Sequence, residues 1–477
     1  MGGTPNAVNF SLTISPRCCT RYDARAKSSL SLEWCVVSRT TKTHERPRMA
    51  TIPHTLAGIK AHVDKYIPPG VIEEACRKDG HVWRERKLGP AVTVHLFLLQ
   101  LLAQVALSGL QRVSGLAVSA QAFCKARQRL PLAVLERLIS AVQIPGKTKG
   151  SLWRGLRIRL VDGMSFLTAD TPELAKKYGK ASNHKGASNG YPVPKLLASV
   201  DLFSGMIRKV IALPWARNER TCLDRLLRLM GRGDLMLADR GLVSFAHIAL
   251  CLKRGIHCLL RLPKGLQVHG RGKGRRRLIQ RLGKQDLLVC WKKPDRRPAW
   301  MSRQRFALLP EQLMLRQVAF RLHRPGFRST WVWVITTLSV AKLYPAKEIA
   351  TLYGKRWQIE VYFRDIRKSL GLTQVSARTV TGVRKEILAF VLLYNLTRRT
   401  MMEAAARQKV APDRLSFIDA LRWLLWSPPG AEPPKLIVNP RRCRATEPRR
   451  LKRGRKRFPQ LRDPRASSRQ PRAAVKI

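Results

Sequence analysis

Residues 156–163 read LRIRLVDG, and this stretch decides the fold class of the chain. Its apolar residues alternate with arginines, which is the two-residue period of a β-strand with one face in a core. The stretch leads into an acid, Asp162. Residues 235–239, LMLAD, predict a second, shorter strand that also ends in an acid, Asp239. Each acid alone is better explained as a strand-end turn or cap, so the pair matters more than either member.

The elements around these strands predict the order strand, strand, strand, helix, strand, helix, strand. Besides the two strands above, the expected segments are strands at 195–200 and 206–213, helices at 219–230 and 244–254, and a strand at 256–262. This is the order of a ribonuclease-H-like α/β core, in which the first and fourth strands lie side by side. We therefore expect Asp162 and Asp239 to meet.

The rest of the chain predicts further domains around this core. Residues 263–343 contain β-like runs and a basic, glycine-containing stretch, and predict a β-rich insertion. The first expected domain is a leader (1–48), which is disordered, or untranslated with Met49 as the start. An all-α, DNA-binding N-terminal domain (49–150) follows, for which a plain packing role is equally compatible. The core (151–262 and 344–436) surrounds the insertion, and a disordered basic tail (437–477) comes last.

The charge of the chain favours a polyanionic partner. Lys and Arg number 91 against 30 Asp and Glu, which gives a formal net charge of +61. Such a chain repels itself unless a polyanion compensates it, so nucleic acid is the leading partner, an anionic membrane surface is the second, and a small-metabolite enzyme is disfavoured. The ten cysteines form no CxxC pair, which argues against a zinc ribbon. The apolar run 92–110 contains polar residues and predicts a buried helix rather than a membrane span.

A helix predicted from Pro345 to Leu370 carries an unusual stripe of side chains. At about 100° per residue, five of them project from one narrow face: Tyr353, Arg356, Glu360, Arg364 and Arg367. Such a stripe is a poor core face and suits a metal-binding acid among groups that hold phosphates. A solvent face with ion pairs such as Glu360 with Arg364 explains the spacing equally well.

Residues 353–367 resemble the Y-(2)-R-(3)-E-(6)-K signature of the DDE transposases of the insertion-sequence-four family. Leu160-Val161-Asp162-Gly163 resembles that family's first-acid strand, and Leu237-Ala238-Asp239-Arg240-Gly241 resembles its second-acid motif. The resemblance runs from about Ile72 to Arg465, and RWQIEVYFRDIRKSLGL at 356–372 is especially close. One departure is Arg367 in place of the usual lysine. Lys368 follows it, but a regular helix turns Lys368 about 100° away.

The resemblance implies two-metal phosphoryl transfer on DNA. Asp162, Asp239 and Glu360 would be the catalytic acids and would hold two Mg²⁺ ions, or Mn²⁺ in their place, roughly 3.5–4 Å apart. Water would nick the element's ends, and the freed 3′-hydroxyl would attack target DNA, with a hairpin intermediate. The implied DNA contacts are Tyr353, Arg356, Arg364, Arg367 and Lys368. The implied partners are double-stranded DNA, as ends and as target, and a second copy of the chain in a homodimer.

Two other functions remain compatible with the sequence. One is an inactive transposase remnant that only binds DNA, and the other is a noncatalytic basic RNA-binding protein. No nucleotide cofactor is expected, because the glycines at 270–274 are not followed by the Gly-Lys-Ser/Thr of a phosphate loop. The expected location is the bacterial cytosol, with association to the nucleoid and none to a membrane. Trp331 and Trp333 alternate on a strand of the insertion, and both are expected in the core rather than on an unpaired base.

Overall fold

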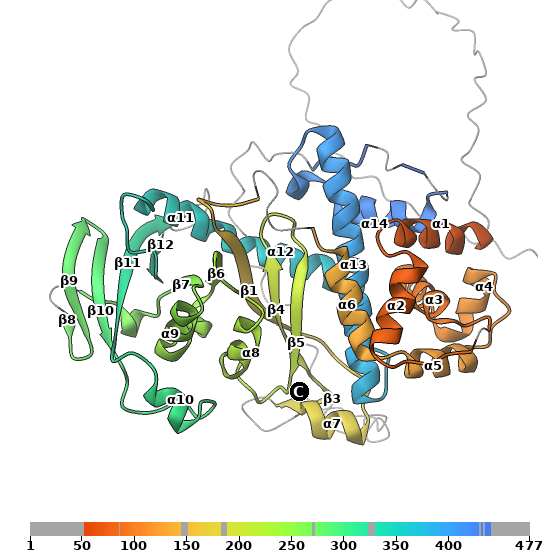
Figure 1. Ribbon diagram of the computed structural model, residues 1–477, viewed down its shortest axis with the longest axis horizontal. Coiled ribbons are helices and arrows are strands. Elements are labelled where there is room, and N and C mark those ends of the chain that lie inside the picture. Colours follow the sequence, from red (N-terminus) through yellow and green to blue (C-terminus); the bar gives the residue numbers. More distant parts are fainter. Residues whose placement is uncertain are drawn as a thin grey trace, which may run out of the picture. The chain divides into compact units, whose positions relative to one another are not determined.

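The computed structural model describes residues 52–84, 86–144, 151–182, 188–269, 272–322, 330–428, 431–432 and 435–439. The predicted leader and all of the predicted tail beyond residue 439 lie outside these ranges. The chain is a mixed α/β structure in which a ten-stranded sheet is flanked by helices (Figure 1).

The sheet has the strand order β5-β4-β1-β6-β7-β12-β11-β10-β9-β8. Its strands are β1 (Arg157–Ser165), β4 (Lys195–Asp201), β5 (Ile207–Leu213), β6 (Asp234–Ala238), β7 (His257–Arg261), β8 (Gly272–Lys273), β9 (Arg276–Gly283), β10 (Asp286–Lys292), β11 (Gln312–Leu322) and β12 (Thr330–Thr336). Strands β1, β6 and β7 are parallel, whereas β4 pairs antiparallel with β1, and β5 pairs antiparallel with β4. The first and fourth predicted strands, β1 and β6, are therefore neighbours, as the sequence predicted.

The strands of the predicted insertion continue the same sheet. Strand β12 pairs with β7 in antiparallel register, and β11, β10, β9 and β8 follow outward. A separate hairpin, β2 (Lys180–Ser182) with β3 (Ser188–Pro192), lies outside this sheet.

Helices cover both faces of the sheet. The helices that follow the core strands are α7 (Pro172–Tyr178), α8 (Leu223–Leu227), α9 (Phe245–Lys253), α10 (Arg303–Ala307), α11 (Ala346–Gly354), α12 (Gln358–Arg364), α13 (Val380–Gln408) and α14 (Phe417–Trp426). Because strand side chains alternate between faces, Leu160 packs into one core with α11, α12 and α13, whereas Val161 packs into the other core with α8 and α9.

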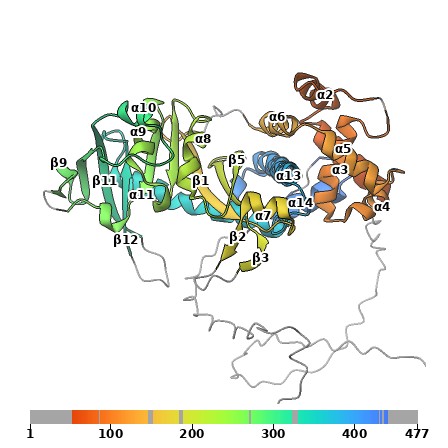
Figure 2. The same cartoon turned by 90° about the horizontal axis from the view of Figure 1, so that it is seen from below.

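The N-terminal part of the described chain is entirely helical. It contains α1 (Ile52–Asp64), α2 (Pro69–Lys78), α3 (Pro90–Ala103), α4 (Leu110–Ser114), α5 (Ala120–Arg129) and α6 (Leu132–Val142). Figures 1 and 2 show α13 between the sheet and these helices, and α13 contacts β5, α3 and α6. Most of α3 is buried, as predicted. No single helix in the described ranges is long and apolar enough to span a membrane. Helix α3 and residues 107–114 together have the length and composition of a span, but the two segments are bent by 112° relative to each other.

Strand β1 and the predicted helix 345–370 differ in detail from the prediction. Strand β1 continues three residues beyond Asp162, so this acid does not end its strand. Arg159 was expected on the polar face of β1, but it is buried because Asp201 and Asp234 bind its guanidinium. The predicted helix 345–370 is interrupted by a 3₁₀ turn at Lys355–Trp357 and ends in a π-helical turn at Asp365–Ser369.

Candidate active site

Two neighbouring parallel strands bring two of the three predicted acids to the same level of the sheet. Val161 of β1 is in register with Ala238 of β6, so the next residues, Asp162 and Asp239, lie side by side. Since side chains alternate along extended backbone, both acids project to the face opposite Val161 and Ala238. That is the face covered by α11 and α12.

Asp162 lies in a partly buried, mixed electrostatic environment. Its Oδ1 accepts a hydrogen bond from the Gly163 amide at 2.8 Å, and its Oδ2 lies 3.6 Å from Nη1 of Arg356. Burial raises the pKa of Asp162 above its usual range, and the charges of Asp239 and Glu360 raise it further. The Gly163 amide and Arg356 oppose this effect. The three acids therefore interact electrostatically at one site.

Asp239 carries a carboxylate oxygen that none of the described residues binds. It follows β6 and precedes a 3₁₀ turn at Arg240–Leu242, but its side chain does not cap that turn. Its Oδ1 is buried and accepts no hydrogen bond from any residue that the structure describes. A buried anionic oxygen without a donor is costly, so this atom is suited to a cation.

Helix α12 supplies the third predicted acid, and α12 packs against β1. Nη2 of Arg356 lies 3.2 Å from Oε1 of Glu360, so one guanidinium lies between Asp162 and Glu360. The Arg356 side chain is 9% exposed, whereas that of Glu360 is 43% exposed. Within the described ranges, no three His, Cys, Asp or Glu side chains are already close enough to form a metal site. Arg356 thus supplies the positive charge between the acids in this structure.

The predicted stripe divides into a buried and an exposed half. Tyr353 and Arg356 are buried, and burial raises the pKa of the Tyr353 phenol far above its usual range. Arg364, Arg367 and Lys368 are exposed and line a cleft of about 720 Å³ together with Asp162 and Glu360. Lys368 reaches this cleft although a regular α-helix would turn it away from Arg367. The π-helical turn at this point changes the angular spacing of the residues.

The side chains of this cleft that were not predicted from the sequence include Lys195, Trp215 and Glu219. The Lys195 ammonium lies 5.0 Å from the centre of the Trp215 ring and donates to the Arg217 carbonyl. Oε1 of Glu219 would lie only 2.9 Å from a Cβ added at Gly163, so glycine beside Asp162 leaves room for this carboxylate. The sequence placed Glu219 only at the start of a helix, and a local pattern carries no signal for a contact 56 positions away.

The two tryptophans of the insertion differ from each other. Trp333 is partly buried and packs against the core, as predicted. Trp331 is 50% exposed, so the prediction that it packs in the core is wrong. The Arg321 guanidinium lies 6.0 Å from its ring.

Comparison with known proteins identifies similar sequences over most of the chain. Residues 153–396, half of the chain, match the family model described as "Transposase DDE domain". The chain is 26% identical over 330 residues to the transposase InsG for insertion sequence element IS4 of Escherichia coli (strain K12), covering 67% of this chain and 70% of that protein. A cryo-EM structure of the piggyBac transposase synaptic complex with hairpin DNA matches with a TM-score of 0.40 and 9% identity, covering 79% of this chain and 80% of that one.

Proposed function

This chain belongs to the transposase DDE domain family, among the transposases of the insertion-sequence-four elements, and from that membership we propose that it cuts DNA at the ends of such an element and joins them to target DNA. The observation that carries the proposal is the placement of the three acids: Asp162 and Asp239 follow paired residues of β1 and β6, and Arg356 lies between Asp162 and Glu360. The proposed fold of residues 151–262 and 344–436 is a ribonuclease-H-like core around a β-rich insertion, with an all-α N-terminal domain.

The carboxylates fit the divalent cations that this chemistry requires. Mg²⁺ prefers carboxylate oxygens, and the buried Oδ1 of Asp239 lacks any donor among the described residues. Asp162, Asp239 and Glu360 would hold two ions, with Glu360 taking part once Arg356 no longer lies between it and Asp162. Bound Mg²⁺ or Mn²⁺ would lower the pKa of water or of a 3′-hydroxyl and stabilise the leaving oxygen.

The remaining residues of the cleft would position the DNA. Arg364, Arg367 and Lys368 form an exposed cationic wall beside the acids, and guanidinium groups hold phosphate oxygens in pairs of hydrogen bonds. The buried Tyr353 and Arg356 would orient Glu360 and contact the backbone near the cut phosphate. Lys368 offers an ammonium in the cleft where the signature lysine is replaced by Arg367.

The partners follow from the same proposal. The substrates would be double-stranded DNA, both as element ends and as target, and the chain would act as a homodimer on paired ends. Association with the bacterial nucleoid in the cytosol is part of the proposal. The net charge of +61 supports a polyanionic partner.

Cleavage of end-containing duplexes tests the function directly. Incubation with Mg²⁺ should yield nicks at the element ends followed by joined products, and Asp162→Asn or Asp239→Asn should abolish both while leaving DNA binding intact. Arg364→Gln should weaken binding without abolishing the cut. If the native chain binds ends but makes no cut in Mg²⁺ or Mn²⁺, it is a binding remnant. If it prefers RNA of equal length and cuts neither, it is a noncatalytic RNA-binding protein.

A further inference from the structure

The cationic wall of the catalytic cleft is followed by a segment, residues 370–379, that forms no regular helix or strand. Thr373 of this segment lines the cleft together with Arg367 and Lys368. The π-helical turn that presents these two cations ends at the start of the segment. Because the segment has no hydrogen-bond ladder of its own, its contacts with other elements fix the place of the wall.

Two hydrogen bonds join the segment to the strand that carries the first acid. The amide of Leu167 donates to the Thr373 carbonyl at 2.9 Å, and the amide of Val375 donates to the Leu167 carbonyl at 2.9 Å. Leu167 lies just beyond the end of β1, and Asp162 of β1 lines the same cleft. A shift of the segment relative to β1 would therefore change the distance between the cations and Asp162.

The buried carboxylate of Glu386, in the first turns of α13, holds the other end of the segment. Its Oε1 accepts a hydrogen bond from the Ser376 amide at 3.0 Å. Its Oε2 accepts from the Ala377 amide at 3.0 Å and from the Ser376 hydroxyl at 3.1 Å. Glu386 is 4% exposed, and hydrogen bonds to an ionised carboxylate are about twice as strong as neutral ones. This side chain is therefore suited to hold a segment that has no regular structure.

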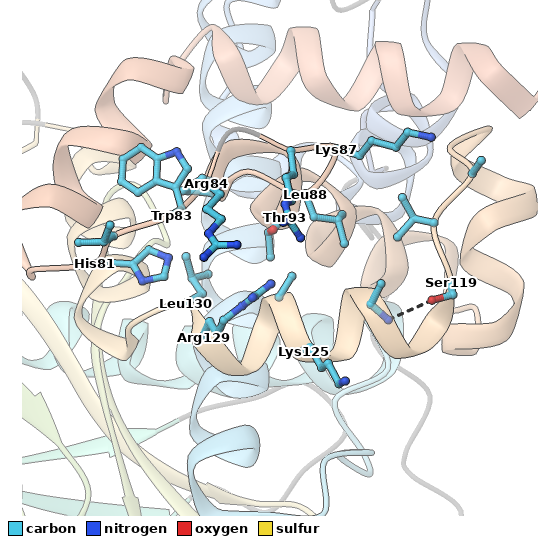
Figure 3. Close-up of a pocket in the computed structure, with 17 residues that line it drawn as sticks. His81, Trp83, Arg84, Lys87, Leu88, Thr93, Ser119, Lys125, Arg129 and Leu130 are labelled. Carbon is cyan, nitrogen blue, oxygen red and sulfur yellow. Dashed lines mark hydrogen bonds between the residues drawn. The ribbon is translucent and has the colours of Figure 1, made fainter.

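The neighbouring residue, Lys385, joins the same turn of α13 to the N-terminal helices. Lys385 is 6% exposed, and its ammonium donates to the carbonyls of Arg127 at 3.1 Å and of Gln128 at 2.6 Å, in the last turn of α5. Figure 3 shows α5 from Ser119 to Leu130, along one side of a cleft in the N-terminal helices. One turn of α13 thus binds α5 through one side chain and the segment beside the catalytic cleft through the next.

A second contact joins the N-terminal helices to the π-helical turn itself. Gln104 ends α3 in the left-handed conformation, with a φ of 52°, which is uncommon for a residue other than glycine. Its Nε2 donates to the carbonyl of Ser369, the last residue of the π-helical turn, at 3.4 Å. The N-terminal helices are therefore connected to both ends of the segment that follows the cationic wall.

We propose that Glu386 is a positioning residue for the proposed reaction, and that it holds residues 373–377 so that Arg367 and Lys368 keep their distance from the acids. The inference rests on the proposed function, because it assumes that the phosphate to be cut lies between these cations and the acids. A misplacement of about 1 Å in a reactive site slows a reaction by up to about 100-fold. Because α3 and α5 contact the same region, a movement of the N-terminal helices changes the geometry of the cleft.

Glu386→Gln and the matched control Glu403→Gln separate this role from a general loss of stability. Both variants remove a carboxylate from α13, but Glu403 accepts hydrogen bonds from Lys65 and Tyr66, at 2.6 Å each. The two sites are about 25 Å apart along the helix, at about 1.5 Å per residue. Single-turnover cutting of an end-containing duplex in Mg²⁺ would be measured at increasing protein concentration.

The cutting rate and the affinity for DNA should respond differently. Glu386→Gln should lower the rate at saturating protein about 10-fold to 100-fold, because the phosphate is held out of line with the acids. The half-saturating protein concentration should stay within about twofold, because many other phosphate contacts share the binding. Glu403→Gln should change neither quantity.

Hydrogen exchange without DNA measures the tie itself. The amides of residues 366–377 should exchange at least about tenfold faster in Glu386→Gln than in the native chain, and at the native rate in Glu403→Gln. Gln104→Gly is a second variant that loses no buried charge, since Gln104 is exposed and glycine suits the left-handed backbone. It should fold normally and slow cutting about threefold.

Native exchange at residues 366–377 in Glu386→Gln would overturn the proposal, and so would faster exchange with an unchanged cutting rate. An equal loss of rate in Glu403→Gln would indicate a general loss of stability and would also overturn it. If Glu386→Gln does not fold, a native cutting rate in Gln104→Gly would overturn it. A native chain that cuts no DNA, with the expected exchange pattern in the variants, would support the tie and contradict the proposed function alone.

Discussion

Replacement of Arg356 by methionine should destabilise the cation-free chain, and divalent cations should largely reverse the loss. The change keeps the aliphatic stem and removes the charge between Asp162 and Glu360. At 3.6 Å and an effective dielectric constant of about 20, the attraction to Asp162 is about 4–5 kcal/mol, much of which is offset by desolvation. Removing one partner of a buried pair costs about 3–5 kcal/mol. Because the Asp162 side chain is 32% exposed, we expect a loss of about 2–3 kcal/mol.

Urea unfolding with a chelator and with excess Mn²⁺ measures this effect. A bound cation takes over the charge compensation, so Mn²⁺ should stabilise Arg356→Met by about 2 kcal/mol more than it stabilises the native chain. Arg364→Met is the matched control, because its side chain is 59% exposed on the adjoining helix α12 and the variant should lose less than about 0.5 kcal/mol. A loss below about 0.5 kcal/mol in Arg356→Met, or equal stabilisation of both chains by Mn²⁺, would refute the reasoning.

Three further substitutions probe other parts of the fold and site. Burial raises the pKa of Asp365 to about 6 from 3.8, so the stability that its protonated form contributes is full below pH 3.8 and is lost as the pH rises through 6. In urea unfolding, the stability of Asp365→Asn should equal that of the native chain at pH 3.5 and exceed it by about 2–3 kcal/mol at pH 7.5. A stability difference that does not change with pH would contradict this. The fully buried Arg316 binds Asp286 at 2.7 Å, so Arg316→Met should cost about 3–5 kcal/mol, and a cost under 1 kcal/mol would argue against the pair. Glu219→Gln should weaken Mn²⁺ binding about fivefold in electron paramagnetic resonance titrations, because the substitution removes a negative charge from the edge of the cleft beside Gly163. An unchanged Mn²⁺ affinity would show that Glu219 does not contribute to cation binding.

The order of the core elements was predictable because it depends on local periodicity. The alternation at 156–161 and the apolar run at 235–238 gave both strands, and the expected adjacency of β1 and β6 is confirmed by their parallel pairing. The hairpin at Asp201–Gly205 was predicted correctly from its turn residues. These local predictions agree with the structure because the flanking segments have the apolar faces that pack against the sheet.

The burial of charged residues was not predictable from local patterns. Arg159 occupies a polar position of the alternating strand, yet it is buried because two acids distant in sequence, Asp201 and Asp234, neutralise it. The spacing of the stripe predicts one regular helix, but the 3₁₀ and π-helical turns alter which side chains share a face. The position of Arg356 between two acids also depends on tertiary packing, which the spacing of a signature does not encode.

The roles of Asp162, Asp239 and Glu360 stay a prediction until a cation is located among them. Anomalous scattering from crystals soaked in Mn²⁺ locates the ions without reference to activity. The account predicts a peak within about 2.0–2.4 Å of carboxylate oxygens from both Asp162 and Asp239, with Glu360 turned toward it and Arg356 displaced, and loss of the peak in Asp239→Asn. Ordered Mn²⁺ at other carboxylates, with this site still held by Arg356, would contradict it.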